Sequence, residues 1–179
     1  MSLRDHFVQM ARNNAWSNLR LYGACRQLDH AGMTATRTSF FPSLLATLQH
    51  LWIVDEYYVD GLEQAGRGAA VWDDEGKHAD VESLWIAQQA VDRRLWALCE
   101  RATTDADLER PITLQRRAGP KVDAARDILA HLFIHQIHHR GQVHAMLSGT
   151  AIAPPQLDEW FLAMDRPIAE KELAGAWGE

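Results

Sequence analysis

The sequence predicts an all-α protein: a four-helix bundle with one long crossover and a short C-terminal helix. Apolar residues recur at three- and four-residue spacing over four long segments, which is typical of amphipathic helices. Prolines and glycines stand at or between the ends of those segments. Only residues 109–121 have β character. The chain has 179 residues, so we expect a single bundle domain over 1–179.

The first half of the chain accounts for two of the helices. A helix is predicted over 3–28, followed by a turn that contains Gly32. The second helix should begin near Pro42 and Ser43, because proline suits the first turn of a helix, and should reach about Gln64. A polar, glycine-containing loop then leads to Asp80.

The second half should supply the other two helices. The third is predicted over 81–101, and residues 109–121 should form an extended excursion or a short hairpin. The fourth helix should run from 122 to 148, where Gly149 ends it. A short terminal helix is expected over 157–164, with fraying from residue 170 onward.

Composition excludes several classes of function. The 18 basic and 24 acidic residues give a formal charge of -6, which argues against a nucleic-acid-binding surface. No apolar run approaches the ~20 residues of a membrane span, and the N-terminus is too polar for a signal peptide. Cys25 and Cys99 lack metal-site spacing and are interpreted as reduced core thiols. We therefore expect a cytoplasmic protein with no nucleic-acid or membrane partner.

The most informative stretch is histidine-rich. Five of the nine histidines fall between His131 and His144. His135 and His139 are four apart, so on a helix both imidazoles can reach one ion. A helical wheel places both in the middle of an apolar arc, with His131 and His138 at its edge and His144 on a second apolar side. Neutral imidazole is the commonest metal ligand in proteins.

A third histidine, His50, also lies inside an apolar arc, on the second predicted helix. Burying three polar rings is costly unless each finds a partner, and one metal ion would satisfy all three. Spacing alone leaves open the alternative that these are hydrogen-bonded core histidines without a metal.

The run from His135 to Gln142 resembles the signature of the DinB-like (DinB/YfiT-like) metal-binding four-helix bundles. That signature is a histidine, three residues and then His-Arg-Gly-Gln on the last long helix, with another histidine on the second helix. The segments 14–19 and 157–162 are also similar to those proteins, so the resemblance covers nearly the whole chain. It implies that His50, His135 and His139 bind one divalent metal. Many members carry asparagine before the first histidine of the pair, where this chain has Ile134.

The resemblance also implies a function. Three nitrogen ligands leave coordination positions open, and they suit zinc or nickel first, with iron or copper as alternatives. Relatives suggest a transferase or isomerase that activates a low-molecular-weight thiol against a small-molecule substrate. The alternatives are a metal-dependent hydrolase, a non-catalytic stress-response metal-binding protein, and a purely structural bundle. No general base is evident, since the wheel places Asp55 and Glu56 off the ligand face.

Two further expectations concern the fourth helix. Gln142 should face the site and hydrogen-bond a ligand water or a substrate, while Arg140 should anchor the helix through ion pairs. The helix also has a second apolar side, and so does the second helix, which favours a homodimer. The alternative is that the terminal segment or the 109–121 excursion covers those sides within one chain. The residues concerned are Leu129, Phe133, Ile137 and Leu147, with Leu44, Leu48, Leu51 and Trp52.

Overall fold

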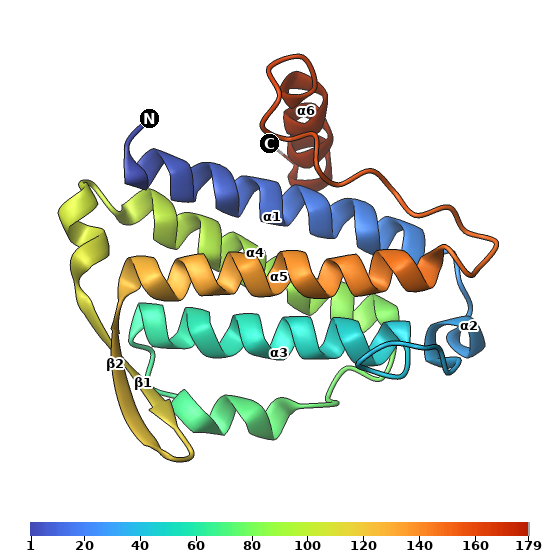
Figure 1. Ribbon diagram of the computed structural model, residues 1–179, viewed down its shortest axis with the longest axis horizontal. Helices are drawn as coiled ribbons and strands as arrows, with labels where there is room; N and C mark the ends of the chain where they lie inside the picture. The colour runs from blue at the N-terminus through green and yellow to red at the C-terminus, as the bar shows by residue number, and fades with distance from the viewer. Residues whose placement is uncertain (179) are drawn as a thin grey trace.

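Four long helices lie side by side in the computed structural model, which describes residues 1–178 (Figure 1). They are α1 (Leu3–Cys25), α3 (Leu44–Glu63), α4 (Val81–Arg101) and α5 (Ala125–Leu147). The shorter elements are α2 (His30–Thr34), η1 (Gly68–Asp74), η2 (Asp105–Glu109), β1 (Pro111–Arg116), β2 (Gly119–Ala124) and α6 (Arg166–Trp177). The all-α bundle prediction is confirmed. No helix among the described residues is long and apolar enough to cross a membrane.

Three of the four long helices begin at side chains that cap free backbone N–H groups; α5, which follows directly from β2, begins at Ala124 without such a cap. Ser2 accepts from Asp5 N–H at the start of α1, Ser43 does so from Ala46 at α3, and Asp80 from Ser83 at α4. The expected start of the second helix near Ser43 is therefore confirmed. These caps fix where each of the three helices begins, and so which side chains its inner face carries.

The stretch with β character forms a two-stranded antiparallel hairpin, β1–β2. Its register pairs Pro111 with Ala124 and continues to Arg116 opposite Gly119. The prediction that a helix begins at residue 122 is wrong, because residues 122–124 are the last part of β2. Backbone pairing with β1 outweighs their local helical pattern. The buried side chains of Ile112 and Leu114 hold the hairpin on the bundle.

The C-terminal prediction is also wrong. Residues 157–164 form turns, and the helix lies later, over Arg166–Trp177, where fraying was expected. Trp160 explains this placement, because it is completely buried in a cluster with Trp16 and Leu173. Packing of that cluster holds α6 against α1 (Figure 1).

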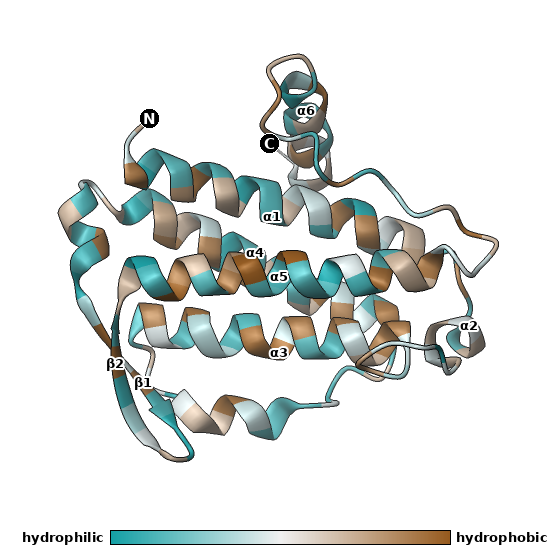
Figure 2. Cartoon of the chain, in the orientation of Figure 1, coloured by the Kyte–Doolittle hydropathy of each residue, from teal (hydrophilic) through white to brown (hydrophobic). Residues whose placement is uncertain are grey.

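Apolar residues line the helix surfaces that meet inside the bundle (Figure 2). Most of the residues that suggested a dimer belong to this core: Leu129, Phe133, Leu147, Leu44, Leu48, Leu51 and Trp52 are all buried. Ile137 is the exception, at 53% exposure. The chain itself therefore covers nearly all of the second apolar sides. The homodimer stays a prediction. Of the residues that suggested it, only Ile137 is exposed and available to a second copy of the chain.

Candidate metal centre

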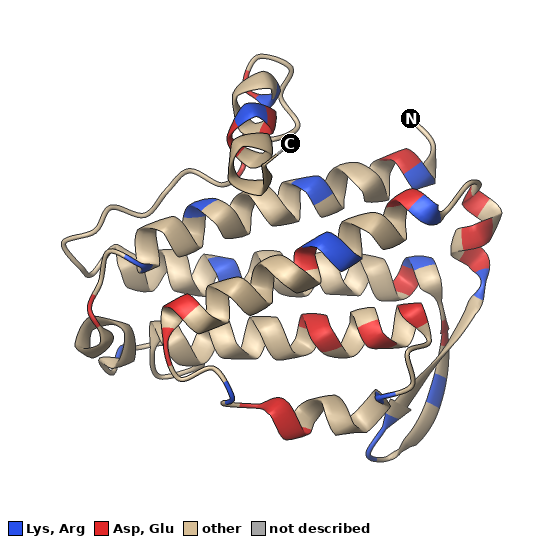
Figure 3. Ribbon diagram, turned by 180° about the vertical axis from the view of Figure 1, so that it is seen from behind, with Lys and Arg blue, Asp and Glu red and all other residues tan. Residues whose placement is uncertain are grey.

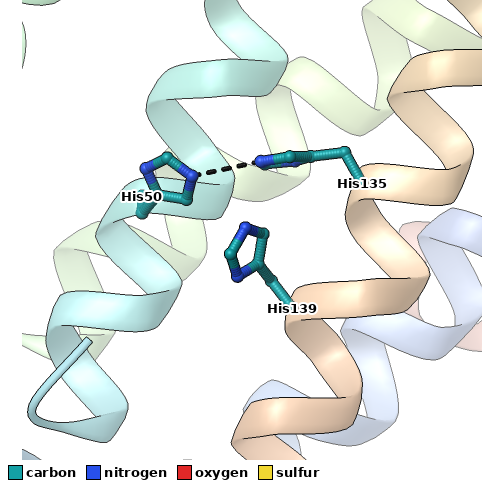
Figure 4. Close-up of side chains that lie close together, drawn as sticks. All are labelled: His50, His135 and His139. Carbon is teal, nitrogen blue, oxygen red and sulfur yellow. Dashed lines mark hydrogen bonds between the residues drawn. The ribbon is translucent and has the colours of Figure 1, made fainter. Parts of the chain in front are cut away.

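His50 of α3 and His135 and His139 of α5 converge in the groove between these two helices (Figure 4). One potential ligand atom of each lies within 4.8 Å of the others. The ring centroids are 5.0 Å apart for His50 and His135, 4.7 Å for His50 and His139, and 4.5 Å for His135 and His139. The structure thus brings together the three histidines that the sequence singled out.

The distance between two of the nitrogens tests whether an ion fits. His50 Nε2 and His135 Nε2 face each other at 3.1 Å. Two nitrogens each ~2.05 Å from one ion, with an angle of about 90–110° between them, would be about 2.9–3.4 Å apart. The observed separation falls in that range. The alternative to a metal ion is a hydrogen bond, with one proton shared between His50 Nε2 and His135 Nε2.

The surroundings favour the neutral, metal-binding form of these rings. Burial lowers the pKa of His50 to about 4 and that of His135 to about 3, and His139 adds to both shifts. Burial also lowers the pKa of His139. Neutral imidazole has one nitrogen with a free lone pair, which is what a metal ion requires. Two such lone pairs facing each other repel unless a cation or a proton lies between them.

Gln142 orients one of the rings. Its Oε1 lies 2.8 Å from His139 Nδ1, so a proton on Nδ1 is donated to the amide and Nε2 is left free for a metal. The same amide donates to His138 Nε2 at 3.1 Å. The expectation that Gln142 faces the site is confirmed. His135 lacks such support, since its buried Nδ1 has no hydrogen-bond partner within residues 1–178, and Ile134 points outward at 67% exposure.

One side of the centre is closed by an aromatic ring. Phe41, in the loop before α3, packs against His50 with 4.3 Å between ring centroids and against His139 with 5.6 Å. On the side of His135 that leads toward the hairpin, the groove opens into a cavity. This cavity gives a small ligand a route to His135.

The other histidines of α5 have different surroundings. His131 is exposed and stacks edge-on against Tyr58, while His144 donates from Nε2 to the Pro155 carbonyl at 3.0 Å. His138 is exposed beside the centre, in contact with Gln142 rather than with His50 or His135. None of these three belongs to the convergent set.

The expectation that Arg140 forms ion pairs is wrong. Arg140 is 4% exposed and forms no direct ion pair in the described part of the chain. Instead its guanidinium donates to the side-chain oxygens of Asn14, Asn18 and Gln136. The helix is anchored as predicted, but by hydrogen bonds to amide oxygens.

Those amides belong to a buried polar network that sequence reasoning missed. Asn14 and Asn18 donate to Asp92, and Gln88 donates to both Asp92 and Asp55. Burial is the largest influence on both carboxyls, raising the pKa of Asp55 to about 7 and that of Asp92 to about 6. A signal was present: polar pairs four residues apart recur on the inward faces of three helices, at 14 and 18, 88 and 92, and 136 and 140.

Comparison with known proteins agrees with this geometry. The DinB family model matches residues 1–172, so the chain belongs to the DinB family. A search of curated proteins found no match. Family membership and the three-histidine cluster are both compatible with metal binding.

Proposed function

We propose that His50, His135 and His139 hold one divalent metal ion in an open site. The observation that carries this proposal is the 3.1 Å approach of two histidine Nε2 atoms that burial keeps neutral. Zinc or nickel suits such a set best, with iron or copper as alternatives, since all accept imidazole nitrogen. Three protein ligands leave room for water or substrate, unlike a closed structural site with four.

The activity that we propose is a metal-dependent transfer or isomerisation that uses a low-molecular-weight thiol. A bound metal ion would supply Lewis acidity, lowering the pKa of a thiol or water or polarising a carbonyl. The chain itself has no reactive thiol to offer among its two cysteines. Cys25 and Cys99 are both buried, and burial raises the pKa of each to about 12. A thiolate nucleophile would therefore have to come from a small molecule.

The residues around the centre would act by positioning and by excluding water. Gln142 fixes the tautomer of His139, and Phe41 shields the face of His50. No carboxylate contacts the three rings within residues 1–178; Asp55 is turned into the buried network, as the wheel indicated. Without a protein base, chemistry that starts from an already ionised thiol is favoured over hydrolysis, which needs a proton acceptor for water. Metal-dependent hydrolysis is the second candidate.

Turnover distinguishes these functions. We would load the purified protein with zinc or nickel and follow consumption of cysteine in the presence of 1-chloro-2,4-dinitrobenzene. The proposal expects catalysis above background that is lost in His139→Ala and kept in His144→Ala. Hydrolysis of 4-nitrophenyl acetate without thiol would favour the hydrolase. Metal binding with neither activity would leave a non-catalytic stress-response protein.

A further inference from the structure

A small cavity adjoins the metal centre on its open side. It has a volume of about 280 Å³ and lies between α3, η1, α5 and the turn of the β1–β2 hairpin. His135 lines its inner end, and Arg116 and Arg117 line it from the hairpin. The volume is close to the lower end of the range for small-molecule sites, which run from roughly 300 to 1,000 Å³.

An unbroken row of rings forms one wall of this cavity. Trp72 and Tyr57 have centroids 5.4 Å apart, and Tyr57 and Tyr58 are 5.3 Å apart. Tyr58 then meets His131 at 5.2 Å, and His131 meets His135 at 6.1 Å. Aromatic side chains at these separations present large apolar faces that favour a planar partner. The row runs from Trp72 of η1 to His135 of the metal centre.

The opposite end of the cavity is basic. Arg116 and Arg117 are exposed at the hairpin turn, where Figure 3 shows Lys and Arg segments. Neither forms an ion pair with any carboxylate of the described chain. Asp123 and Asp127 line a neighbouring cavity that shares Arg116. In a chain of net charge -6, two adjacent cations without a carboxylate partner among the described residues are therefore available to an anionic ligand.

The hairpin turn is tied to the aromatic wall. The Tyr57 hydroxyl donates to the Gln115 carbonyl at 3.2 Å, next to Arg116. Burial is the largest influence on the pKa of Tyr57 and of Tyr58 and raises both, while nearby Arg116 acts in the opposite direction. Both phenols therefore stay neutral at pH 7, and neither places a negative charge that would compete for the arginines.

We propose that this cavity binds a small carboxylate substrate with an aromatic or other planar apolar body. The carboxylate lies at Arg116 and Arg117, the planar body lies against Tyr57, Tyr58 and Trp72, and the reactive end faces His135. Guanidinium groups suit this role because their paired N–H donors match the two oxygens of a carboxylate. The reaction assigned to the substrate rests on the proposed function, but the binding site does not.

Binding of benzoate and of its neutral analogue benzamide tests the site directly. Isothermal titration of the zinc-loaded chain should show that Arg116→Gln and Arg117→Gln each weaken benzoate binding about tenfold. Benzamide binding should not change in either variant. Lys121→Gln is the matched control, because Lys121 is an exposed cation of β2 outside the cavity lining, and it should leave benzoate affinity unchanged.

Metal analysis of the same samples separates the two proposals. Arg116→Gln and Arg117→Gln should keep the wild-type metal content, and His139→Ala should lose metal while keeping benzoate binding. If wild-type protein takes up no metal but still binds benzoate through the arginines, the proposed function fails and this site stands. The site is refuted if the arginine variants bind benzoate normally, if Lys121→Gln is equally damaging, or if binding depends on His139 alone, which would place the carboxylate at the metal.

Discussion

Replacing Arg140 with methionine should cost more stability than any change on the surface of α5. Methionine fills much of the same volume but donates no hydrogen bond. The oxygens of Asn14, Asn18 and Gln136 would each lose a buried donor. An unsatisfied buried group costs about 1–3 kcal/mol, and Arg140→Met would leave several such oxygens at once. We therefore expect a loss of about 3–5 kcal/mol, a large share of the roughly 5–15 kcal/mol of a typical domain.

The stability lost in Arg140→Met should depend on pH. The folded-state pKa values of Asp55 and Asp92, about 7 and about 6, lie above the ordinary value of 3.8. The folded chain therefore holds protons on these two carboxyls that the unfolded chain releases, so their contribution to stability falls as the pH rises from about 4 through 7. Arg140 opposes this fall because its charge lowers both pKa values. Without it, the decline should be steeper, and the variant should lose more at pH 8 than at pH 5.5.

Urea unfolding of the metal-free chain at both pH values measures these effects. Arg126→Met is the control, since Arg126 lies on the surface of the same helix with its side chain 41% exposed, and it should shift stability by about 0.5 kcal/mol or less. A loss below about 1 kcal/mol for Arg140→Met at pH 8, or an equal loss at both pH values, would refute the network as described.

Three further predictions concern the metal centre and assembly. Gln142→Leu should weaken metal affinity roughly 10–100-fold in a chelator competition, because His139 loses the acceptor at Nδ1; unchanged affinity would mean that this contact is dispensable. Burial lowers the pKa of His50 to about 4, that of His135 to about 3 and that of His139 as well, so metal affinity should fall at a lower pH than the ordinary histidine pKa of roughly 6.5 would give; a decline already between pH 8 and 7 would point to other ligands. Sedimentation equilibrium should show a homodimer through the exposed α5 surface at Ile137, and a 20.2 kDa species at every micromolar concentration would contradict it.

Periodicity predicted the bundle and placed His50, His135 and His139 on inward helix faces, and the structure confirms that the three rings lie together. That they are metal ligands came from the resemblance to the DinB-like bundles and stays a prediction. Apolar residues on the inward faces of the four helices left little freedom in how α3 and α5 face each other, so three inward histidines had to be close. The hairpin boundary at 122 could not be predicted in the same way. It depends on pairing with residues 111–113, which a local pattern does not contain.

Two other features depended on tertiary packing. The helix α6 forms because Trp160 is buried against Trp16, a contact between the two ends of the chain. The cavity beside His135 exists because the hairpin turn reaches the C-terminal half of α3, which brings Arg116 to Tyr57. Both features depend on contacts between different elements, Trp160 with Trp16 and Arg116 with Tyr57. The spacing of residues along one helix or strand does not reveal such contacts. The buried polar network, by contrast, was readable as inward polar pairs and was missed.

Metal content of the untagged chain tests the central claim most directly. We expect about one divalent ion per chain in the wild-type protein, and we expect His135→Ala to lose it. The His144→Ala variant should keep the ion, because His144 donates a hydrogen bond to the Pro155 carbonyl and lies outside the cluster. Wild-type protein that takes up no zinc, nickel, iron or copper at neutral pH, or a His144→Ala variant that loses metal as completely as His135→Ala, would contradict the three-histidine centre.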